Sequence, residues 1–137
     1  MLTNIPLMAL ALIIYNGIVF GLGGGDASTL WQDELFSLNM VSGAVWVFTF
    51  GDLMVTIGLV LLFIEILKAT RIGKLSIVDH LLSTLVLIAF LVEFLLVQAA
   101  STSVFFALML MTLIDVTAGF SVSIRSATRD VSLGDQL

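Results

Sequence analysis

Four long runs of apolar residues, joined by short polar stretches, make up most of this chain. An α-helix rises about 1.5 Å per residue, so each run is about long enough to cross a hydrocarbon core of roughly 30 Å. Only 11% of the 137 residues are charged, against about a quarter in soluble domains. We therefore expect an all-α integral membrane four-helix bundle, a single transmembrane domain over residues 1–137, with spans at about 5–22, 41–67, 76–99 and 104–124.

The composition also excludes several classes of function. A net charge of −5, with five Lys and Arg residues in all, argues against nucleic acid, whose phosphates are bound by clustered basic side chains. The absence of Cys excludes disulfides and thiolate catalysis, and a single His excludes paired-histidine haem or metal ligation within one chain. No Ser-His-acid set is apparent. We expect no enzymatic activity, no metal and no cofactor.

The basic residues all lie on one side of the predicted spans. Each follows the second or the fourth span, and the other two loops carry none. By the positive-inside rule, the N-terminus, the loop 68–74 and the C-terminus are cytoplasmic. The first four residues contain no Lys or Arg, so we expect the first span to be retained rather than cleaved as a signal peptide. In the outer loop, Trp31, Leu35 and Leu38 recur at helical spacing, which predicts a short interfacial helix.

Four polar side chains fall inside the predicted spans: Asn16, Asp52, Glu93 and Asp115. Counting along the spans puts Asp52 and Asp115 near the membrane midplane, and Asn16 and Glu93 at one level nearer the outer surface. Charged groups are costly there and should face the bundle interior. Two interpretations remain open. Neutral carboxyls can hydrogen-bond between helices and hold the bundle together, or the acids can form a proton or cation path.

Two further sets of residues are candidates for interactions near the helix ends. Glu65 and His80 lie at matching cytoplasmic ends of the second and third spans, where a hairpin connection could pair them as a titrating site. The alternative is that Glu65 reaches the surface beside Lys68. Small residues spaced by four favour close helix packing, and they occur as Gly17 with Gly21 and as Gly119 with Ser123.

Several stretches together resemble a family of small four-span inner-membrane proteins of proteobacteria that has no assigned activity. They are Gly51-Asp52-Leu53, Phe63 to Arg71, Ser76 to Leu82, and Asp115 to Asp130. The resemblance covers nearly the whole chain. It implies a four-span, multi-pass protein of the bacterial inner (plasma) membrane, and it carries over no functional residue.

Three functions follow as hypotheses. The first is a non-enzymatic membrane protein that acts by lateral association, as a homo-oligomer or as an accessory subunit of a larger membrane complex, because short loops and small-residue surfaces leave association as the least demanding role. Its partners are then membrane lipid and other membrane-protein subunits or further copies of itself. The second is a proton- or cation-coupled transporter or channel that uses the intramembrane carboxyls. A membrane-embedded enzyme acting on lipid is the third.

Overall fold

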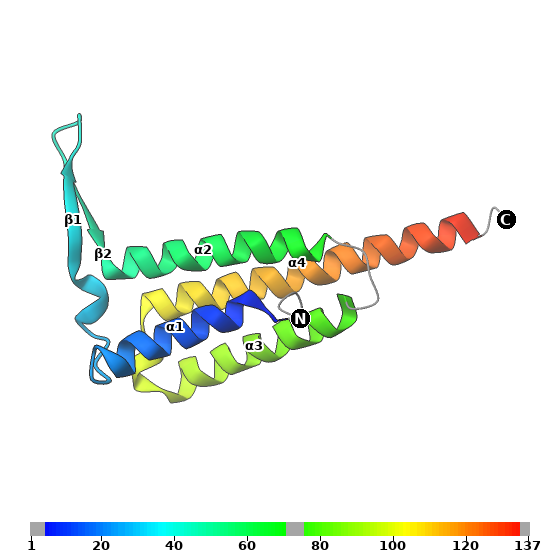
Figure 1. Cartoon of the computed structure of the whole chain (residues 1–137), viewed down its shortest axis with the longest axis horizontal. Coiled ribbons are helices and arrows are strands. Elements are labelled where there is room, and N and C mark those ends of the chain that lie inside the picture. Colours follow the sequence, from blue (N-terminus) through cyan, green and yellow to red (C-terminus); the bar gives the residue numbers. More distant parts are fainter. Residues whose placement is uncertain (1–4, 71–75, 135–137) are drawn as a thin grey trace.

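The computed structural model describes residues 5–70 and 76–134, and the side chains of residues 76, 123, 126 and 130 are outside that description. Four α-helices and one β-hairpin make up the described chain (Figure 1). In chain order, the elements are α1 (Leu7–Gly21), the 3₁₀ turn η2 (Leu30–Gln32), β1 (Glu34–Asn39), β2 (Val45–Thr49), α2 (Phe50–Ala69), α3 (Ser76–Leu96), the 3₁₀ turn η3 (Gln98–Ala100) and α4 (Ser103–Gly134).

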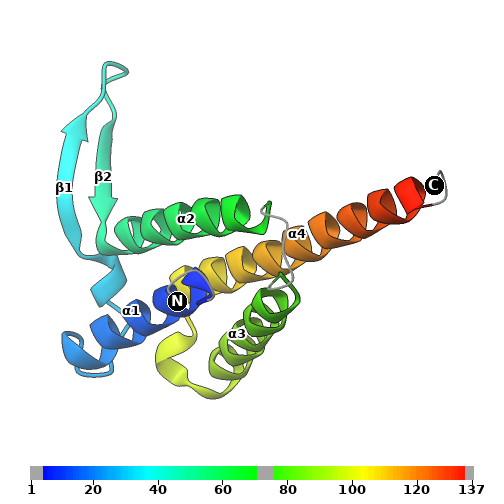
Figure 2. The same ribbon diagram turned by 45° about the vertical axis from the view of Figure 1, so that its right-hand side comes forward.

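The helices run alongside one another, and the chain passes between two ends of the bundle (Figure 1). The start of α1, the end of α2 and the start of α3 lie at one end, which we call the α2–α3 end. The hairpin lies at the opposite end, the hairpin end, and projects sideways at a steep angle to the helices in both views (Figures 1 and 2). The last part of α4 continues past the other helices.

Three helices, α2, α3 and α4, are long and apolar enough to cross a membrane. The first predicted span is helical, but α1 has only 15 residues, or about 22 Å at 1.5 Å per residue. Large apolar side chains on all four helices remain exposed; they include Ile13, Phe63, Leu85, Leu96 and Ile114. The bundle therefore presents apolar side chains on its outside as well as in its interior.

The interior is built around α1 and an aromatic cluster at the hairpin end. Helix α1 buries residues spaced by three or four, which is the period that places them on one helix face: Met8, Ala11, Tyr15 and Val19. The Tyr15 ring stacks on Trp31 with centroids 4.8 Å apart and meets Phe105 of α4 edge-on at the same distance. Phe50 and Phe90 extend the cluster to α2 and α3. This cluster joins the hairpin base to the helices.

The outer loop differs from the prediction, because a β-hairpin replaces the short interfacial helix. Strands β1 and β2 pair antiparallel, and Gly43 takes the left-handed backbone conformation (φ 87°) that closes the turn between them. The β-branched and aromatic residues of β2 favour a strand. Since they are also apolar, hydropathy alone merges them with the helix that follows. The predicted start of the second span at residue 41 was therefore wrong, and α2 begins at Phe50.

The remaining predicted boundaries differ from the structure to different extents. Helix α3 ends at Leu96, three residues before the predicted end of the third span at 99, and η3 follows it. Helix α4 begins at Ser103 and continues to Gly134, ten residues past the apolar run that ended the prediction at 124. The polar tail that we expected after the fourth span is thus largely a continuation of its helix.

Candidate functional site: buried polar side chains and an apolar hairpin

Five polar or charged side chains are buried among the described residues, and all come from α2, α3 and α4: Glu65, His80, Ser83, Thr112 and Asp115. Burying such groups is costly unless they find hydrogen-bond partners or neutralise their charge. They are therefore the side chains whose surroundings bear most directly on function.

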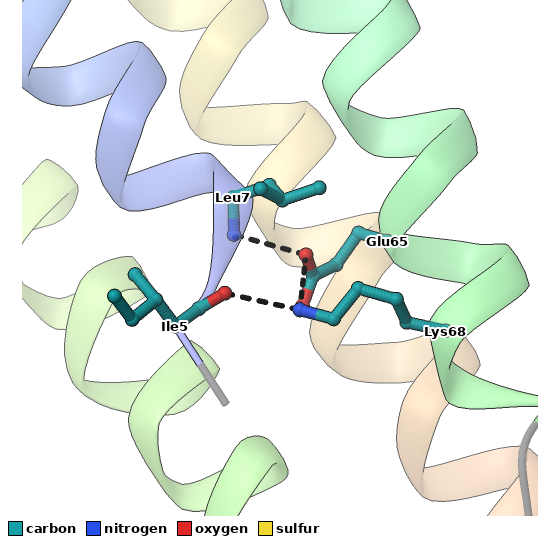
Figure 3. A network of polar contacts seen from close by, with 4 residues as sticks. All are labelled: Ile5, Leu7, Glu65 and Lys68. Carbon is teal, nitrogen blue, oxygen red and sulfur yellow. Dashed lines mark hydrogen bonds and ion pairs between the residues drawn. The ribbon is translucent and has the colours of Figure 1, made fainter. Parts of the chain in front are cut away.

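Glu65 connects the end of α2 to the start of α1 (Figure 3). Its Oε2 atom accepts a hydrogen bond from the backbone N–H of Leu7 at 2.9 Å. Lys68, one turn along α2, lies 3.3 Å from the same carboxylate and also donates to the carbonyl of Ile5 at 3.0 Å. Because Pro6, the residue that precedes α1, provides no side-chain cap, Glu65 supplies from another helix the acceptor that the first turn of α1 lacks.

Asp115 lies in the interior with fewer partners. It is 4% exposed, and its Oδ2 atom has no hydrogen-bond partner among the described residues. Ser83 of α3 lies beside the carboxyl group, and Glu65 and Lys68 of α2 act on it electrostatically. Two acidic side chains from neighbouring helices thus interact in the bundle interior, with one lysine near both.

His80 packs tightly against α4. A Cβ atom added at Gly119 would lie 2.5 Å from His80 Nδ1, so only a glycine fits beneath the ring. The imidazole centroid is also 5.6 Å from that of Phe120. A close approach of α4 to another helix at Gly119 agrees with the small-residue pattern. The pairing of His80 with Glu65 stays a prediction, since the hydrogen bonds of the Glu65 carboxylate described above go to Leu7 and Lys68.

The sequence predicted Asp52 near the middle of a helix, but the structure places it at the start of one. It is the third residue of α2, where its carboxylate accepts from the backbone N–H of Thr49 at 2.9 Å while its own N–H donates to Thr49 Oγ1 at 3.2 Å. This reciprocal pair is a capping box, and Asp52 is exposed. The predicted position near the middle of a helix was wrong, because α2 begins nine residues after the predicted start of the span.

The remaining predicted polar residues lie apart from the buried acids. The Asn16 amide donates to the carbonyl of Leu12 in its own helix at 3.1 Å. Glu93, one turn from the end of α3, is half-buried and acts electrostatically on Tyr15. The structure therefore separates Asp52 and Glu93 from Asp115 and brings Glu65 to Asp115 instead.

The Tyr15 hydroxyl makes polar contacts that the sequence analysis did not predict. Its hydroxyl donates to the carbonyl of Ala99 at 2.8 Å and lies 2.7 Å from Thr102 Oγ1. Thr102 Oγ1 in turn accepts the N–H of Phe105 at 3.1 Å and so caps the start of α4. The chain contains a single tyrosine, placed in an otherwise apolar helix, and that was the available signal.

The predicted glycine pairs have different surroundings. Gly17 and Gly21 have no atom within 4 Å of an added Cβ, so no helix of the described chain packs closely on them. Gly58, which we had not singled out, would place a Cβ 2.5 Å from Leu108 and is a site where α2 approaches α4 closely. The side chain of Ser123 lies outside the described residues.

A cleft of about 530 Å³ opens at the hairpin end of the bundle. It lies where η2, the start of α2 and the start of α4 meet, and its lining mixes hydroxyl and apolar groups. The lining residues include Ser28, Trp31, Gln32, Asp52, Ser101 and Val104. Asp52 thus borders this cleft.

The hairpin, which we call the arm (Glu34–Thr49), exposes an apolar surface. Phe36 lies opposite Phe48, and Leu38 lies opposite Trp46, so these four side chains share one face of the two-stranded sheet. The rings of Phe36 and Phe48 stack at 4.9 Å. Every residue of β1 is exposed, and no charged residue occurs between the base of the arm at Glu34 and Asp52.

Comparison with known proteins provides no further assignment. No protein-family model, curated protein or solved structure matches the chain. Among the described residues, no group of three or more His, Asp or Glu side chains could hold a metal ion.

Proposed function

We propose that this protein is a non-enzymatic, multi-pass membrane protein that acts by lateral association, and that the arm joins it to a second copy of the same chain. The arm is the observation that carries this proposal, because every residue of β1 and the first three residues of β2 are exposed. The one-sided distribution of Lys and Arg supports cytoplasmic termini. The resemblance to proteobacterial inner-membrane proteins supports the bacterial inner membrane as the location of the protein.

A membrane environment for the helices is supported by their surfaces. In α3, only 17% of the most apolar 18-residue window is buried inside the bundle. Outward side chains such as Leu81, Ile88 and Leu95 would expose apolar area to water, whereas lipid removes that cost. The same reasoning applies to α2, because only 28% of its apolar 18-residue window is buried.

The arm has properties that favour pairing with another strand. A two-stranded hairpin is only marginally stable alone, and each of its outer edges carries backbone N–H and C=O groups without ladder partners. Exposed aromatic residues add to the area that association would remove from water. Since the arm has no charged side chain beyond Glu34, two identical arms can meet without electrostatic repulsion.

The direction of the arm favours a second copy as its occupant. All copies of a membrane protein cross in the same direction, so arms that project sideways from the bundle lie at the same level (Figure 2). A twofold axis along the membrane normal runs at right angles to such an arm and therefore brings identical edge strands together antiparallel. The resulting four-stranded sheet closes the association at a dimer.

Disulfide crosslinking in native membranes tests this contact, because the chain has no cysteine of its own. We expect Ser37→Cys on β1 or Val47→Cys on β2 to crosslink two copies after mild oxidation, since one of these edges forms the contact. Gln98→Cys, exposed in η3 at the same end of the bundle, is the matched control and should remain monomeric. Absence of crosslinked dimer for both arm variants would refute the proposal.

A charge variant provides a second test of the same contact. Val47→Lys should lower the fraction of dimer in mild detergent, because two lysines would approach each other and the desolvated edge. Val47→Thr keeps a β-branched, uncharged side chain and should leave the dimer fraction unchanged. If both variants stay dimeric, the β2 edge is not the contact. If wild-type protein is monomeric at all concentrations, the association itself is wrong.

A further inference from the structure

We propose that Asp115 is a proton-binding site: its carboxyl group carries a proton at mildly acidic pH, where exposed aspartates are ionised, and α4 packs against α2 only while that proton is bound. This inference concerns the bundle interior and does not depend on the arm. It rests on the different surroundings of two buried acidic side chains: Glu65 has hydrogen-bond donors, whereas the Oδ2 atom of Asp115 has none among the described residues.

Glu65 has the partners that an ionised carboxylate requires. It accepts the Leu7 N–H at 2.9 Å and lies 3.3 Å from Lys68 Nζ. Leu7 is the first residue of α1, so the carboxylate also lies at the positive end of that helix dipole. These contacts stabilise the negative charge of Glu65, although the side chain is only 5% exposed.

Asp115 has no comparable set of donors. Ser83 is the neighbouring hydroxyl, and the Oδ2 atom has no hydrogen-bond partner among the described residues. Lys68 is engaged by Glu65 and by the Ile5 carbonyl, so it is shared rather than dedicated to Asp115. A second negative charge beside Glu65 in a buried position is costly, and a proton on Asp115 removes that cost.

The other polar groups on the surrounding helices complete the site's electrostatics. From α3, His80 packs at Gly119, one turn beyond Asp115, and Asp79 precedes it in the first turn of that helix. From α4 itself, Thr112 is committed to the Leu108 carbonyl at 2.9 Å. The start of α1 has no ionisable side chain, and it contributes to the site only the Leu7 N–H that donates to Glu65.

Loss of the proton has a structural consequence. Helices α2 and α4 meet closely at Gly58, whose position leaves no room beside Leu108 and Met111. Ionised Asp115 would repel Glu65 within this contact. We therefore expect raised pH to separate the two helices, and we expect the neutral side chain of Asp115→Asn to keep them together over the same pH range.

Infrared spectroscopy of the purified, folded protein tests the proton directly. At mildly acidic pH, wild-type protein should show the C=O stretch of a protonated carboxyl group, and Asp115→Asn should abolish it. The variants Asp52→Asn and Glu93→Gln are matched controls, because they remove acids outside this site, and both should retain the band. On raising the pH, the band should disappear from wild-type protein and the close α2–α4 contact should be lost with it. A spin-label or fluorophore pair on these two helices measures the distance between them.

Several outcomes would overturn the proposal. They are the absence of a protonated carboxyl band in wild-type protein at mildly acidic pH, its persistence in Asp115→Asn, or an α2–α4 distance that stays constant while the band titrates. If Asp115→Asn does not fold, Ser83→Ala serves instead. Removing the neighbouring hydroxyl should move the band to higher frequency, because the acid loses a hydrogen bond, and an unmoved band would count against Asp115 as its source.

Discussion

The carboxylate of Glu65 lies 2.9 Å from the backbone nitrogen of Leu7, so a side chain near the end of α2 caps the first turn of α1. The first N–H groups of a helix have no partner within that helix. In this bundle, the missing acceptor comes from a residue 58 positions away. The interaction therefore fixes both the beginning of a helix and its position against a neighbour.

Removing this cap should destabilise the bundle. We expect Glu65→Ala to lower the free energy of unfolding by about 2–3 kcal/mol, since a partly buried N–H loses a charged acceptor. Glu65→Gln keeps an oxygen that can accept from Leu7 and should cost less. Denaturant titration in detergent, followed by circular dichroism, measures both. Equal unfolding free energies for wild type and Glu65→Ala would show that the cap contributes nothing.

The Tyr15 hydroxyl should stabilise the connection between α3 and α4. Tyr15→Phe keeps the ring that stacks on Trp31 but removes the bonds to Ala99 and Thr102, so we expect a loss of about 1–2 kcal/mol in unfolding free energy. Thr102→Val should cost about 1 kcal/mol through the lost cap of α4. Because the two hydroxyls contact each other, the double variant should cost less than the sum of the single variants.

How far the sequence predicts the fold depends on which property forms each element. Hydropathy predicted four helices because apolar runs and helix lengths coincide in α3 and in most of α1 and α2. It failed where a strand was equally apolar, at Val45–Thr49. That single error moved the start of α2 and, with it, the supposed depth of Asp52.

The candidate site was less predictable than the helices. Asp115 and Glu65 were recognisable as acids within apolar runs, but their interaction depends on the depth and rotation of two helices, which periodicity does not give. The Tyr15 bond to Ala99 spans 84 residues and involves a backbone carbonyl. No local sequence pattern encodes such a contact. Gly58 and Gly17 likewise look alike in sequence and differ only in what packs on them.

The capping box at the base of the arm should contribute to stability and not to transport. Thr49→Ala and Asp52→Ala each remove one half of a reciprocal pair, and we expect each to cost about 1 kcal/mol in unfolding free energy. Their effects should not add, because either substitution breaks the same motif. Proton or cation flux in proteoliposomes should be the same for Asp52→Asn as for wild type. Flux abolished by that variant would return Asp52 to a transport path.

Glycine-to-alanine substitutions should distinguish close helix contacts from open surface. At Gly119, a Cβ would lie 2.5 Å from the rigid His80 ring, so we expect Gly119→Ala to destabilise the bundle by about 1–3 kcal/mol through overpacking. Gly58→Ala should cost less, since the atoms that it meets are the ends of Leu108 and Met111 side chains, which can move. Gly17→Ala meets nothing within the chain and should stabilise α1 by up to about 1 kcal/mol through helix propensity. Thermal unfolding in detergent compares the three, and a loss of stability at Gly17 would indicate that another copy or a partner packs on that face.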